Sequence, residues 1–436
     1  MRESRIWRRV LGVQDTVIER VFFDEDAGAV IVSVRPYARA RDRCGLCHAR
    51  CAGYDRGAGR RRWRGLDCGQ VRVFVEAAAP RVSCPEHGVV VAAVPWARHG
   101  AGHTRSFDDT VAWMATQMSG SATCELQRIA WRTVGAIVAR VWADTGSGRD
   151  RLRGLRRIGI DEVAYKKGHK YVTVVVDHDT GALVWAAEGR TKATLHKFFD
   201  ELGPQRTSNL THVSADGASW IAAVLNTRCP DAIRCADPFH VVAWAGQALD
   251  TVRRAAWNRI RGRVEGQTPP SITVGYKSRS KPTKTPAARM KRSRWVLLKN
   301  PENLRENQKA LLQWIKVNDR QLHRAYRLKE GLRLVFHLPY EDAVPALDAW
   351  ISWARRSRIP AFVALQKTIV KHRPQILASI EHNMSNGRVE SVNTKIRLIT
   401  RRGFGFHTPE AVVALAMLSL GGARPQLPGR DPRMSQ

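Results

Sequence analysis

Acidic residues are scarce in this chain of 436 residues. Only 39 Asp and Glu residues stand against 72 Lys and Arg residues, which gives a formal net charge of +33 at pH 7. Repulsion among so many like charges opposes a compact fold unless a polyanion neutralises them. We therefore expect a nucleic-acid partner. A basic protein that associates with ribosomes is the alternative.

Long apolar runs are absent as well. No stretch reaches the roughly eighteen consecutive apolar residues that a membrane-spanning helix needs. Residues 1–9 also lack the apolar core of a secretory signal. We expect a cytoplasmic, nucleoid-associated protein with no membrane partner. Apolar residues still make up 44% of the chain, enough to build several domains with cores of their own.

Cysteine is uncommon outside one short region. Of eight cysteines, five lie between Cys44 and Cys84, and in a reducing compartment such clustering favours a metal over disulfides. Two closely spaced pairs have the ligand spacing of a tetrahedral zinc site. The expected Zn²⁺ ligands are Cys44, Cys47, Cys84 and His87. With a hairpin over residues 62–75 between the pairs, a zinc-ribbon-like module is predicted over residues 1–97. Ligation through His48, Cys51 or Cys68, or free cysteines in a small core, are the alternatives.

Helical periodicity begins beyond residue 104. Residues 107–118, 125–130 and 134–142 have helical spacing, with Ser121 as the expected N-cap of the second helix and residues 131–133 as a turn. This spacing is typical of a helix-turn-helix unit, which we expect over residues 98–150. The side chains expected to face a DNA groove are Arg132, Thr133 and Arg140. A three-helix packing unit without DNA contacts is the alternative.

Residues 151–245 have the pattern of a mixed sheet. β-branched and apolar runs predict strands at residues 157–165, 171–177, 182–187, 210–217 and 232–236, with helices at 192–202 and 218–225. This order fits an α/β fold with a ribonuclease H-like core, with Asp161 in the first strand and Asp216 ending the fourth. A carboxylate buried in a sheet costs several kcal/mol unless a cation meets it. A metal ion is one such cation.

A helical and strongly basic region interrupts this core between residues 246 and 375. Residues 303–316, 321–336 and 340–356 predict helices of an all-α insertion. Residues 266–295 contain eight Lys and Arg residues and no Asp or Glu, which predicts a mobile loop that orders on a phosphate backbone. The DNA contacts expected there are Lys277, Lys281, Lys284, Lys291 and Arg292. A solvated loop without a ligand is the alternative.

The second part of the core is expected over residues 376–422, followed by a disordered tail at 423–436. A helix at residues 386–397 would place Glu390, Asn393 and Arg397 on one side, at i, i+3 and i+7. Arg388, Lys395 and Arg397 are the DNA contacts expected from this helix.

Three carboxylates stand out from this pattern: Asp161, Asp216 and Glu390. Oxygen-only ligands select hard cations, so the expected metal is Mg²⁺ or Mn²⁺. Two such ions about 3.5–4 Å apart support in-line phosphoryl transfer. For any one of these carboxylates, a strand-end cap or a surface salt bridge is the alternative.

Several short segments occur in a recognisable order, at residues 159–162, 216–217, 237–240, 297–304 and 386–390, with Asn393 beyond them. Together with the N-terminal cysteine pairs they resemble the DDE transposases of bacterial insertion sequences, in the ISL-three family. The resemblance covers nearly the whole chain. It implies that Asp161, Asp216 and Glu390 are the acidic triad and that His240 contacts the scissile phosphate or a flipped base. Asp237 is the rival for the second metal ligand.

The resemblance also implies a reaction. A protein of this kind would bind the terminal inverted repeats of its insertion sequence, cleave the DNA ends and join the 3′ ends to target DNA. The zinc and helix-turn-helix units would read base edges, and the insertion would hold the backbone. Pairing two ends requires at least a dimer, so we expect a homo-oligomer on double-stranded DNA. A transposase-derived regulator without strand transfer, and a nuclease that stops at hydrolysis, are the alternatives.

Overall fold

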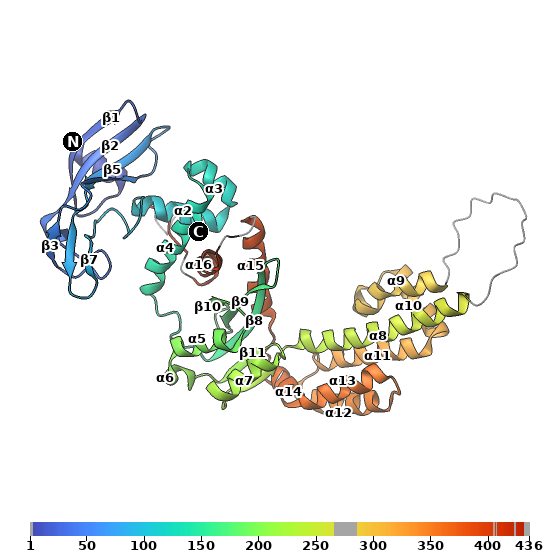
Figure 1. Ribbon diagram of the computed structural model, residues 1–436. Coiled ribbons are helices and arrows are strands. Elements are labelled where there is room, and N and C mark those ends of the chain that lie inside the picture. The colour runs from blue at the N-terminus through green and yellow to red at the C-terminus, as the bar shows by residue number, and fades with distance from the viewer. Residues whose placement is uncertain (1–2, 266–285, 404–405, 407, 423, 431–436) are drawn as a thin grey trace, which may run out of the picture.

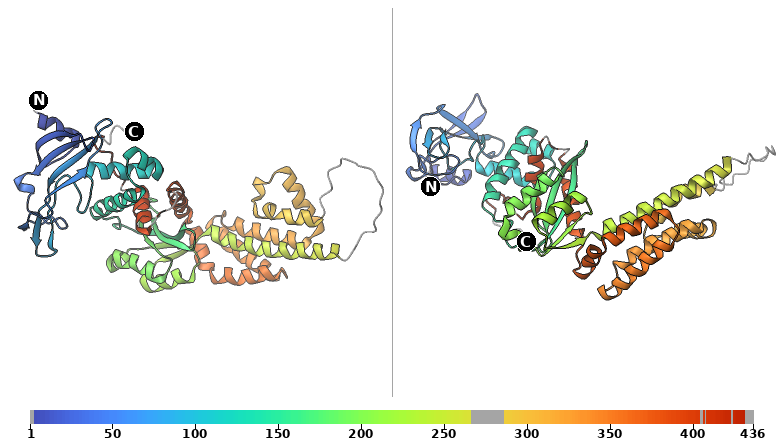
Figure 2. Two further views of the ribbon diagram at one scale, coloured as in Figure 1. Left: turned by 45° about the horizontal axis from the view of Figure 1, so that its top comes forward. Right: turned by 60° about the horizontal axis from the view of Figure 1, so that its bottom comes forward.

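The computed structural model describes residues 3–265, 286–403, 406, 408–422 and 424–430. Figure 1 shows a β-rich N-terminal module, a helical unit, a central α/β core and a long helical arm, in chain order. Figure 2 shows the arm projecting from the core on the side opposite the N-terminal module. Within the described residues, no helix is both long enough and apolar enough to cross a membrane.

The N-terminal module begins with helix α1 (Glu3–Leu11), and two sheets follow it in the chain. The larger has the order β1-β2-β5-β4, formed by β1 (Thr16–Asp24), β2 (Ala29–Pro36), β4 (Arg60–Arg64) and β5 (Arg72–Ala78). The smaller contains β3 (Ala52–Asp55), β6 (Arg81–Cys84) and β7 (Gly88–Val91). The hairpin expected over residues 62–75 exists as β4 and β5, but it belongs to the larger sheet because β5 also pairs with β2 in parallel.

The helical unit consists of α2 (Arg105–Gln117), α3 (Gly120–Gln127) and α4 (Trp131–Ser147). Two details of the prediction are wrong. The Ser119 side chain, rather than that of Ser121, accepts the N-cap hydrogen bond of α3. Residues 131–133 form the first turn of α4 instead of a turn between helices, because Arg128 adopts the left-handed conformation and ends α3.

The core sheet has five strands in the order β10-β9-β8-β11-β12. They are β8 (Arg157–Lys166), β9 (Lys170–Asp177), β10 (Leu183–Glu188), β11 (His212–Ala215) and β12 (Ile233–Ala236). Strand β9 pairs antiparallel with both β8 and β10, whereas β11 is parallel to both β8 and β12. All five strands were predicted, and this order and direction are those of a ribonuclease H-like sheet.

Helices cover both faces of this sheet. One face packs on α5 (Lys192–Leu202), which precedes the short α6 (Pro204–Thr207), and on α7 (Ser219–Arg228), around Ile158 and Ile160. The other face packs on α15 (Gly387–Arg402) and α16 (Pro409–Leu420), around Val163 and Val174. Since side chains alternate along a strand, Asp161 shares the α15 face with Val163, and Glu162 shares the opposite face with Ile160.

The helical arm begins inside the expected core. Helix α8 (Pro238–Glu265) starts directly after β12 and crosses the boundary expected at residue 246 without a break. The other helices of the arm are α9 (Pro286–Leu298), α10 (Glu306–Asn318), α11 (Arg320–Val335), α12 (Tyr340–Arg356), α13 (Pro360–Lys371) and α14 (Arg373–Glu381). They share one apolar core that includes Ala256, Leu328 and Trp350.

The expected basic loop is partly helical. Residues 286–295 belong to α9, because Met290 and Leu297 are buried in the apolar core of the arm. Lys291 and Arg292 lie on the exposed side of this helix. Lys277, Lys281 and Lys284 lie outside the described residues, as do the last six residues of the expected tail.

Candidate zinc site and active site

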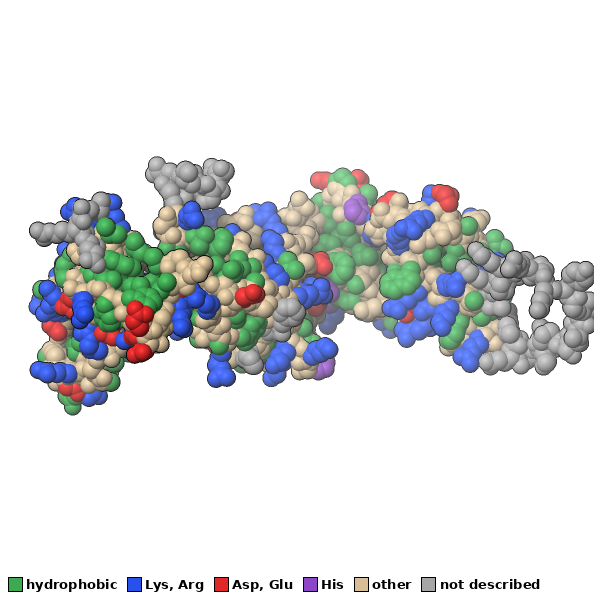
Figure 3. All heavy atoms as spheres, turned by 90° about the horizontal axis from the view of Figure 1, so that it is seen from above, with side chains coloured by type: hydrophobic (Ala, Val, Ile, Leu, Met, Phe, Trp, Pro, Cys, Tyr) green, Lys and Arg blue, Asp and Glu red, His purple; other side chains and the backbone are tan. Residues whose placement is uncertain are grey.

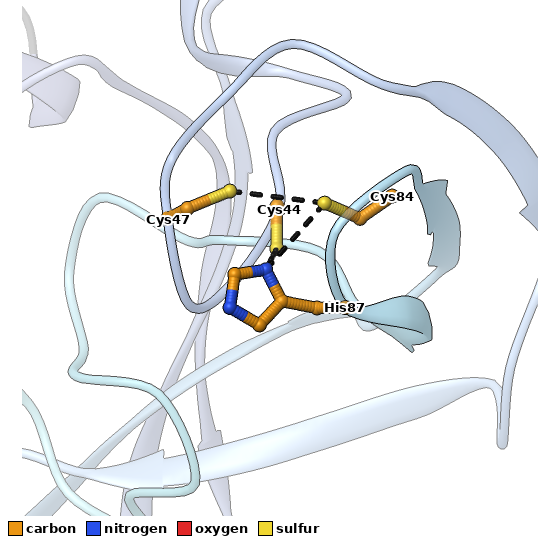
Figure 4. Close-up of side chains that lie close together, drawn as sticks. All are labelled: Cys44, Cys47, Cys84 and His87. Atoms are coloured by element: carbon orange, nitrogen blue, oxygen red, sulfur yellow. Dashed lines mark hydrogen bonds between the residues drawn. The ribbon is translucent and has the colours of Figure 1, made fainter.

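Four metal-binding side chains of the N-terminal module converge in Figure 4. Cys44 and Cys47 come from the loop before β3, whereas Cys84 ends β6 and His87 lies in the turn before β7. One ligand atom from each lies within 4.8 Å of all the others. The Cys47 and Cys84 sulfurs are 3.7 Å apart, close to the roughly 3.8 Å that a tetrahedral site with Zn–S bonds of about 2.3 Å requires. The donor set therefore fits Zn²⁺, as predicted.

The alternative zinc ligands do not belong to this group. His48, Cys51 and Cys68 are absent from the four-residue cluster in the described part of the chain. Cys68 is exposed and bonds through its backbone to Val71 in a turn. The interaction between His87 and Cys84 lowers the pKa of Cys84 to about 6, which favours the thiolate that a metal binds.

Asp161 lies where β11 ends beside β8. Ala215, the last residue of β11, pairs with Ile160, so the chain leaves β11 through Asp216 next to Asp161. Burial raises the pKa of Asp161, and the charges of Asp216 and Asp237 act in the same direction. The sheet therefore brings three carboxylates together at one edge, where their repulsion favours a bound cation.

His240 is the cation present among these carboxylates. Its Nδ1 is 2.7 Å from Oδ2 of Asp237, and its Nε2 is 3.6 Å from Oδ2 of Asp216. The hydrogen bond with Asp237, supported by the charge of Asp216, raises the pKa of His240 to about 9. At neutral pH, His240 is thus an imidazolium that holds Asp216 and Asp237 on either side of its ring.

Helix α15 lies across β8 and bonds to Asp161. Asn393, which is 1% exposed, donates from Nδ2 to Oδ2 of Asp161 at 2.8 Å. Glu390 lies one turn earlier and is exposed, with no side-chain hydrogen bond or ion pair among the described residues. The carboxylate oxygens of Asp161, Asp216 and Glu390 are not all within 4.8 Å of one another, unlike the zinc donors.

A buried chain of hydrogen bonds fixes the start of α15. His178 Nε2 lies 2.6 Å from Oγ of Ser214, and Ser214 donates to Oδ1 of Asn386. The backbone N–H of Asn386 donates to Oδ1 of Asp237 at 3.3 Å. Because Ser214 donates to Asn386, it accepts from His178, whose pKa is lowered by burial so that the ring is neutral. The chain links β9, β11 and α15 to the Asp237–His240 pair.

Comparisons with known proteins identify the family of this chain. Residues 158–415 match the DDE transposase family of ISL3 elements, whose description is "Transposase". This chain is a DDE transposase of the ISL3 family. Residues 92–142 of the transposase match the "Helix-turn-helix domain of transposase family ISL3", and residues 40–87 match the "zinc-finger of transposase IS204/IS1001/IS1096/IS1165".

Two kinds of relative are similar over nearly the full length. The transposase is 57% identical over 446 residues, covering 100% of both chains, to the "Transposase for insertion sequence element IS1557" from two strains of Mycobacterium tuberculosis. It is 27% identical over 421 residues to the "Transposase for insertion sequence element IS1001" of Bordetella parapertussis, covering 94% of this chain and 96% of the relative.

The residues expected to contact DNA differ in their surroundings. Arg132 is exposed and Thr133 half-buried in the first turn of α4. Arg140 faces inward and bonds to the fully buried Asp108 at 2.9 Å, so it stabilises the helical unit. Arg388 donates to the backbone carbonyl oxygens of residues 178 and 179, which ties α15 to the turn after β9.

The sequence did not single out three residues near the site: Ser214, His178 and Glu162. Ser214 and His178 carry no motif, and only the tertiary contact with Asn386 reveals them. Glu162 lies next to Asp161 on the opposite face of the sheet. Burial, reinforced by the charges of Asp161 and Asp216, raises the pKa of Glu162 to about 7. A second carboxylate directly after Asp161 was the only available signal.

Proposed function

We propose that this transposase binds the terminal inverted repeats of its insertion sequence, cleaves the DNA ends and transfers the 3′ ends to target DNA. The observation that carries the proposal is the meeting of Asp161, Asp216 and His240 at one sheet edge, with the helix of Glu390 tied to Asp161 through Asn393. Elements far apart in sequence supply these groups, which supports a site assembled for one reaction.

Asp161, Asp216 and Glu390 would hold Mg²⁺ or Mn²⁺ through oxygen ligands. Burial and two neighbouring carboxylates raise the pKa of Asp161, which is the electrostatic setting that a divalent cation offsets. When bound, a pair of such ions supplies an activated oxygen nucleophile and neutralises the leaving oxygen. Asp237 is engaged by His240 and by the Asn386 backbone, so Asp216 is the better candidate for the second ligand.

The protein groups around these carboxylates have separate roles in the proposal. Asn393 donates to Oδ2 of Asp161 and the backbone N–H of Glu162 donates to Oδ1, so hydrogen bonds to both oxygens orient this carboxylate. Asp237 raises the pKa of His240 through a hydrogen bond to Nδ1, and the Nε2 side of the ring can donate a hydrogen bond to a scissile phosphate. Asp237 orients the His240 ring, in the way that a carboxylate commonly fixes an imidazole.

A large groove of the helical arm begins next to this site, at Pro238 and Phe239. It has a volume of about 1330 Å³ and lies between the start of α8 and the helices α9 and α11, with Phe239, Arg254 and Arg294 in its lining. Figure 3 shows that Lys and Arg side chains predominate over Asp and Glu on one face of the core and arm. The zinc module and helix-turn-helix unit would recognise end sequence, and two protomers would pair two ends.

The test is metal-dependent cleavage and joining of DNA that carries the element's end. Glu390→Gln is expected to lower the rate by about 10²–10³-fold, the loss typical of removing one group that stabilises transition-state charge. Glu410→Gln is the matched control, because Glu410 is also exposed and also lies in the first turn of its helix, α16. Equal rates for both variants would contradict the role of Glu390.

The same experiment separates the alternative functions. Tight binding of end DNA by the wild type without any cleavage would favour a transposase-derived regulator. Cleavage without joining would favour a nuclease. Intact Asp161, Asp216 and Glu390 favour an active enzyme over a transposase-derived regulator, and the joining step alone distinguishes the transposase from a nuclease.

A further inference from the structure

The β8–β9 hairpin extends beyond the rest of the core sheet. β11 accompanies β8 only as far as Ile160, and β10 accompanies β9 only as far as Val172, whereas β8 and β9 continue to pair up to Lys166 and Lys170. At about 3.3 Å per residue, the tip at Lys166 lies roughly 17 Å beyond Asp161. The hairpin therefore projects outward from the active-site edge.

The tip of this hairpin is basic and exposed. Lys166, Lys167 and Lys170 are all exposed, with Gly168 and His169 forming the turn in left-handed conformations. None of the three lysines has an acidic partner among the described residues. Many arginines elsewhere in the structure do form ion pairs, for example Arg81 with Asp55 and Arg373 with Asp348. Three adjacent unpaired cations repel one another unless an anion binds them.

Helix α15 continues this positive surface. α15 packs along β8 and runs in the same direction, since Val389 lies next to Gly159 and Asn393 binds Asp161. Figure 1 shows α15 alongside the strands β8 and β9. Glu390, Arg397 and Arg401 occur at i, i+7 and i+11 and share the exposed side of the helix. Arg397 and Arg401 also have no acidic partner within the described residues.

We propose that Lys166, Lys167, Lys170, Arg397 and Arg401 form a basic ridge that binds the phosphate backbone of duplex DNA beside the scissile bond. The ridge begins near Asp161 and Glu390 and leads away from them, so a duplex entering the site would lie along it. With one base pair per roughly 3.4 Å, the 17 Å reach corresponds to about five base pairs. This inference rests on the proposed function and adds where the duplex next to the scissile bond lies on the protein.

The decisive comparison is the salt dependence of DNA binding. In a Glu390→Gln background, which is expected to slow cleavage, duplex DNA carrying the element's end is titrated with protein at several salt concentrations. Each phosphate contact contributes about 0.9 to the slope of log K against log salt, so K166A/K167A/K170A is expected to lower the slope by about 2.7. Between 50 and 200 mM salt, the parent would then lose about 40-fold more affinity than the variant. K166R/K167R/K170R keeps the charges and is expected to keep the slope.

Truncated DNA tests the position of the ridge. Two further duplexes end close to the cleavage position, one on each side of it. The difference in salt slope between the parent and K166A/K167A/K170A is expected to vanish on one of these duplexes and to remain on the other. K316A/K367A/K371A is the matched control, because these three exposed lysines lie on α10 and α13 in the helical arm. The truncated duplex that abolishes the effect of K166A/K167A/K170A on the salt slope should leave the effect of K316A/K367A/K371A unchanged.

The outcomes separate this inference from the proposed function. An unchanged slope in the alanine variant, or a difference that persists on both truncated duplexes, would overturn the ridge even where the wild type cleaves DNA. A reduced slope that depends on one flank supports the ridge even where the wild type shows no cleavage, since binding is measured without it.

Discussion

Ser214 provides a quantitative test of the hydrogen-bond chain that fixes the catalytic helix. Ser214 is 0% exposed, accepts from His178 and donates to Asn386. Ser214→Ala removes little volume but leaves a buried donor and a buried acceptor without partners. Each unsatisfied group costs about 1–3 kcal/mol, so for two groups we expect a loss of roughly 2–6 kcal/mol in the free energy of local opening.

The assay is hydrogen exchange of the full chain, read in peptides that cover β11 and α15. A loss of 2–6 kcal/mol corresponds to exchange that is about 30- to 20,000-fold faster in those peptides, because each 1.4 kcal/mol changes an equilibrium tenfold. Ser293→Ala is the matched control. Ser293 is equally buried, but it bonds only to Met290 in its own helix, so its loss leaves no tertiary partner unsatisfied.

Equal protection of α15 from exchange in the wild type and the Ser214→Ala variant would contradict this role of Ser214. An equal loss of protection around Ser214 in Ser214→Ala and around Ser293 in Ser293→Ala would contradict it as well. Cleavage assays on the same proteins should show a larger loss for Ser214→Ala, because Asn386 directly precedes the helix that carries Glu390.

Three further predictions concern separate sites. Cys84→Ser should lower the zinc content of purified protein from about one ion per chain toward zero, whereas Cys68→Ser should leave it unchanged, as measured by metal analysis. Gly159→Ala should destabilise the core by about 1–3 kcal/mol in denaturant titrations, because the added Cβ would lie 2.3 Å from a side-chain carbon of α15. In metal-free protein, NMR titration should give His240 a pKa of about 9 that falls toward 6.5 in Asp237→Asn. Since this pKa is raised on folding, its stabilisation is complete below about pH 6.5 and is lost as the pH rises through about 9.

The sheet and the zinc ligands were predictable because their signals are local. The β-branched runs predicted all five core strands, and α5 begins and ends at the predicted residues. The cysteine pairs predicted the four zinc donors, since short ligand spacing constrains geometry through only a few backbone angles. Asp161, Asp216 and Glu390 all lie within residues 158–415, the range that matches the family, and their role as the acidic triad stays a prediction.

Other features could not be read from local pattern. Proline and basic residues predicted a loop through residue 295, but α9 forms there because Met290 and Leu297 are buried against the other helices of the arm. Arg140 was expected to face DNA, yet Asp108 lies buried across the helical unit and binds it. In both cases a tertiary contact outweighs the local composition.

Local sequence pattern predicted the five strands of the core sheet and the residue types that could hold metals, and net charge predicted a polyanionic partner. Those properties follow from periodicity, ligand spacing and net charge, all of which act over short stretches or over the chain as a whole. Only the tertiary structure decided that Asn393 meets Asp161, 232 positions away, and that Ser214 meets Asn386, 172 positions away. Such pairings arise because the apolar side of α15 packs on the sheet, and packing brings together polar groups that no local pattern relates.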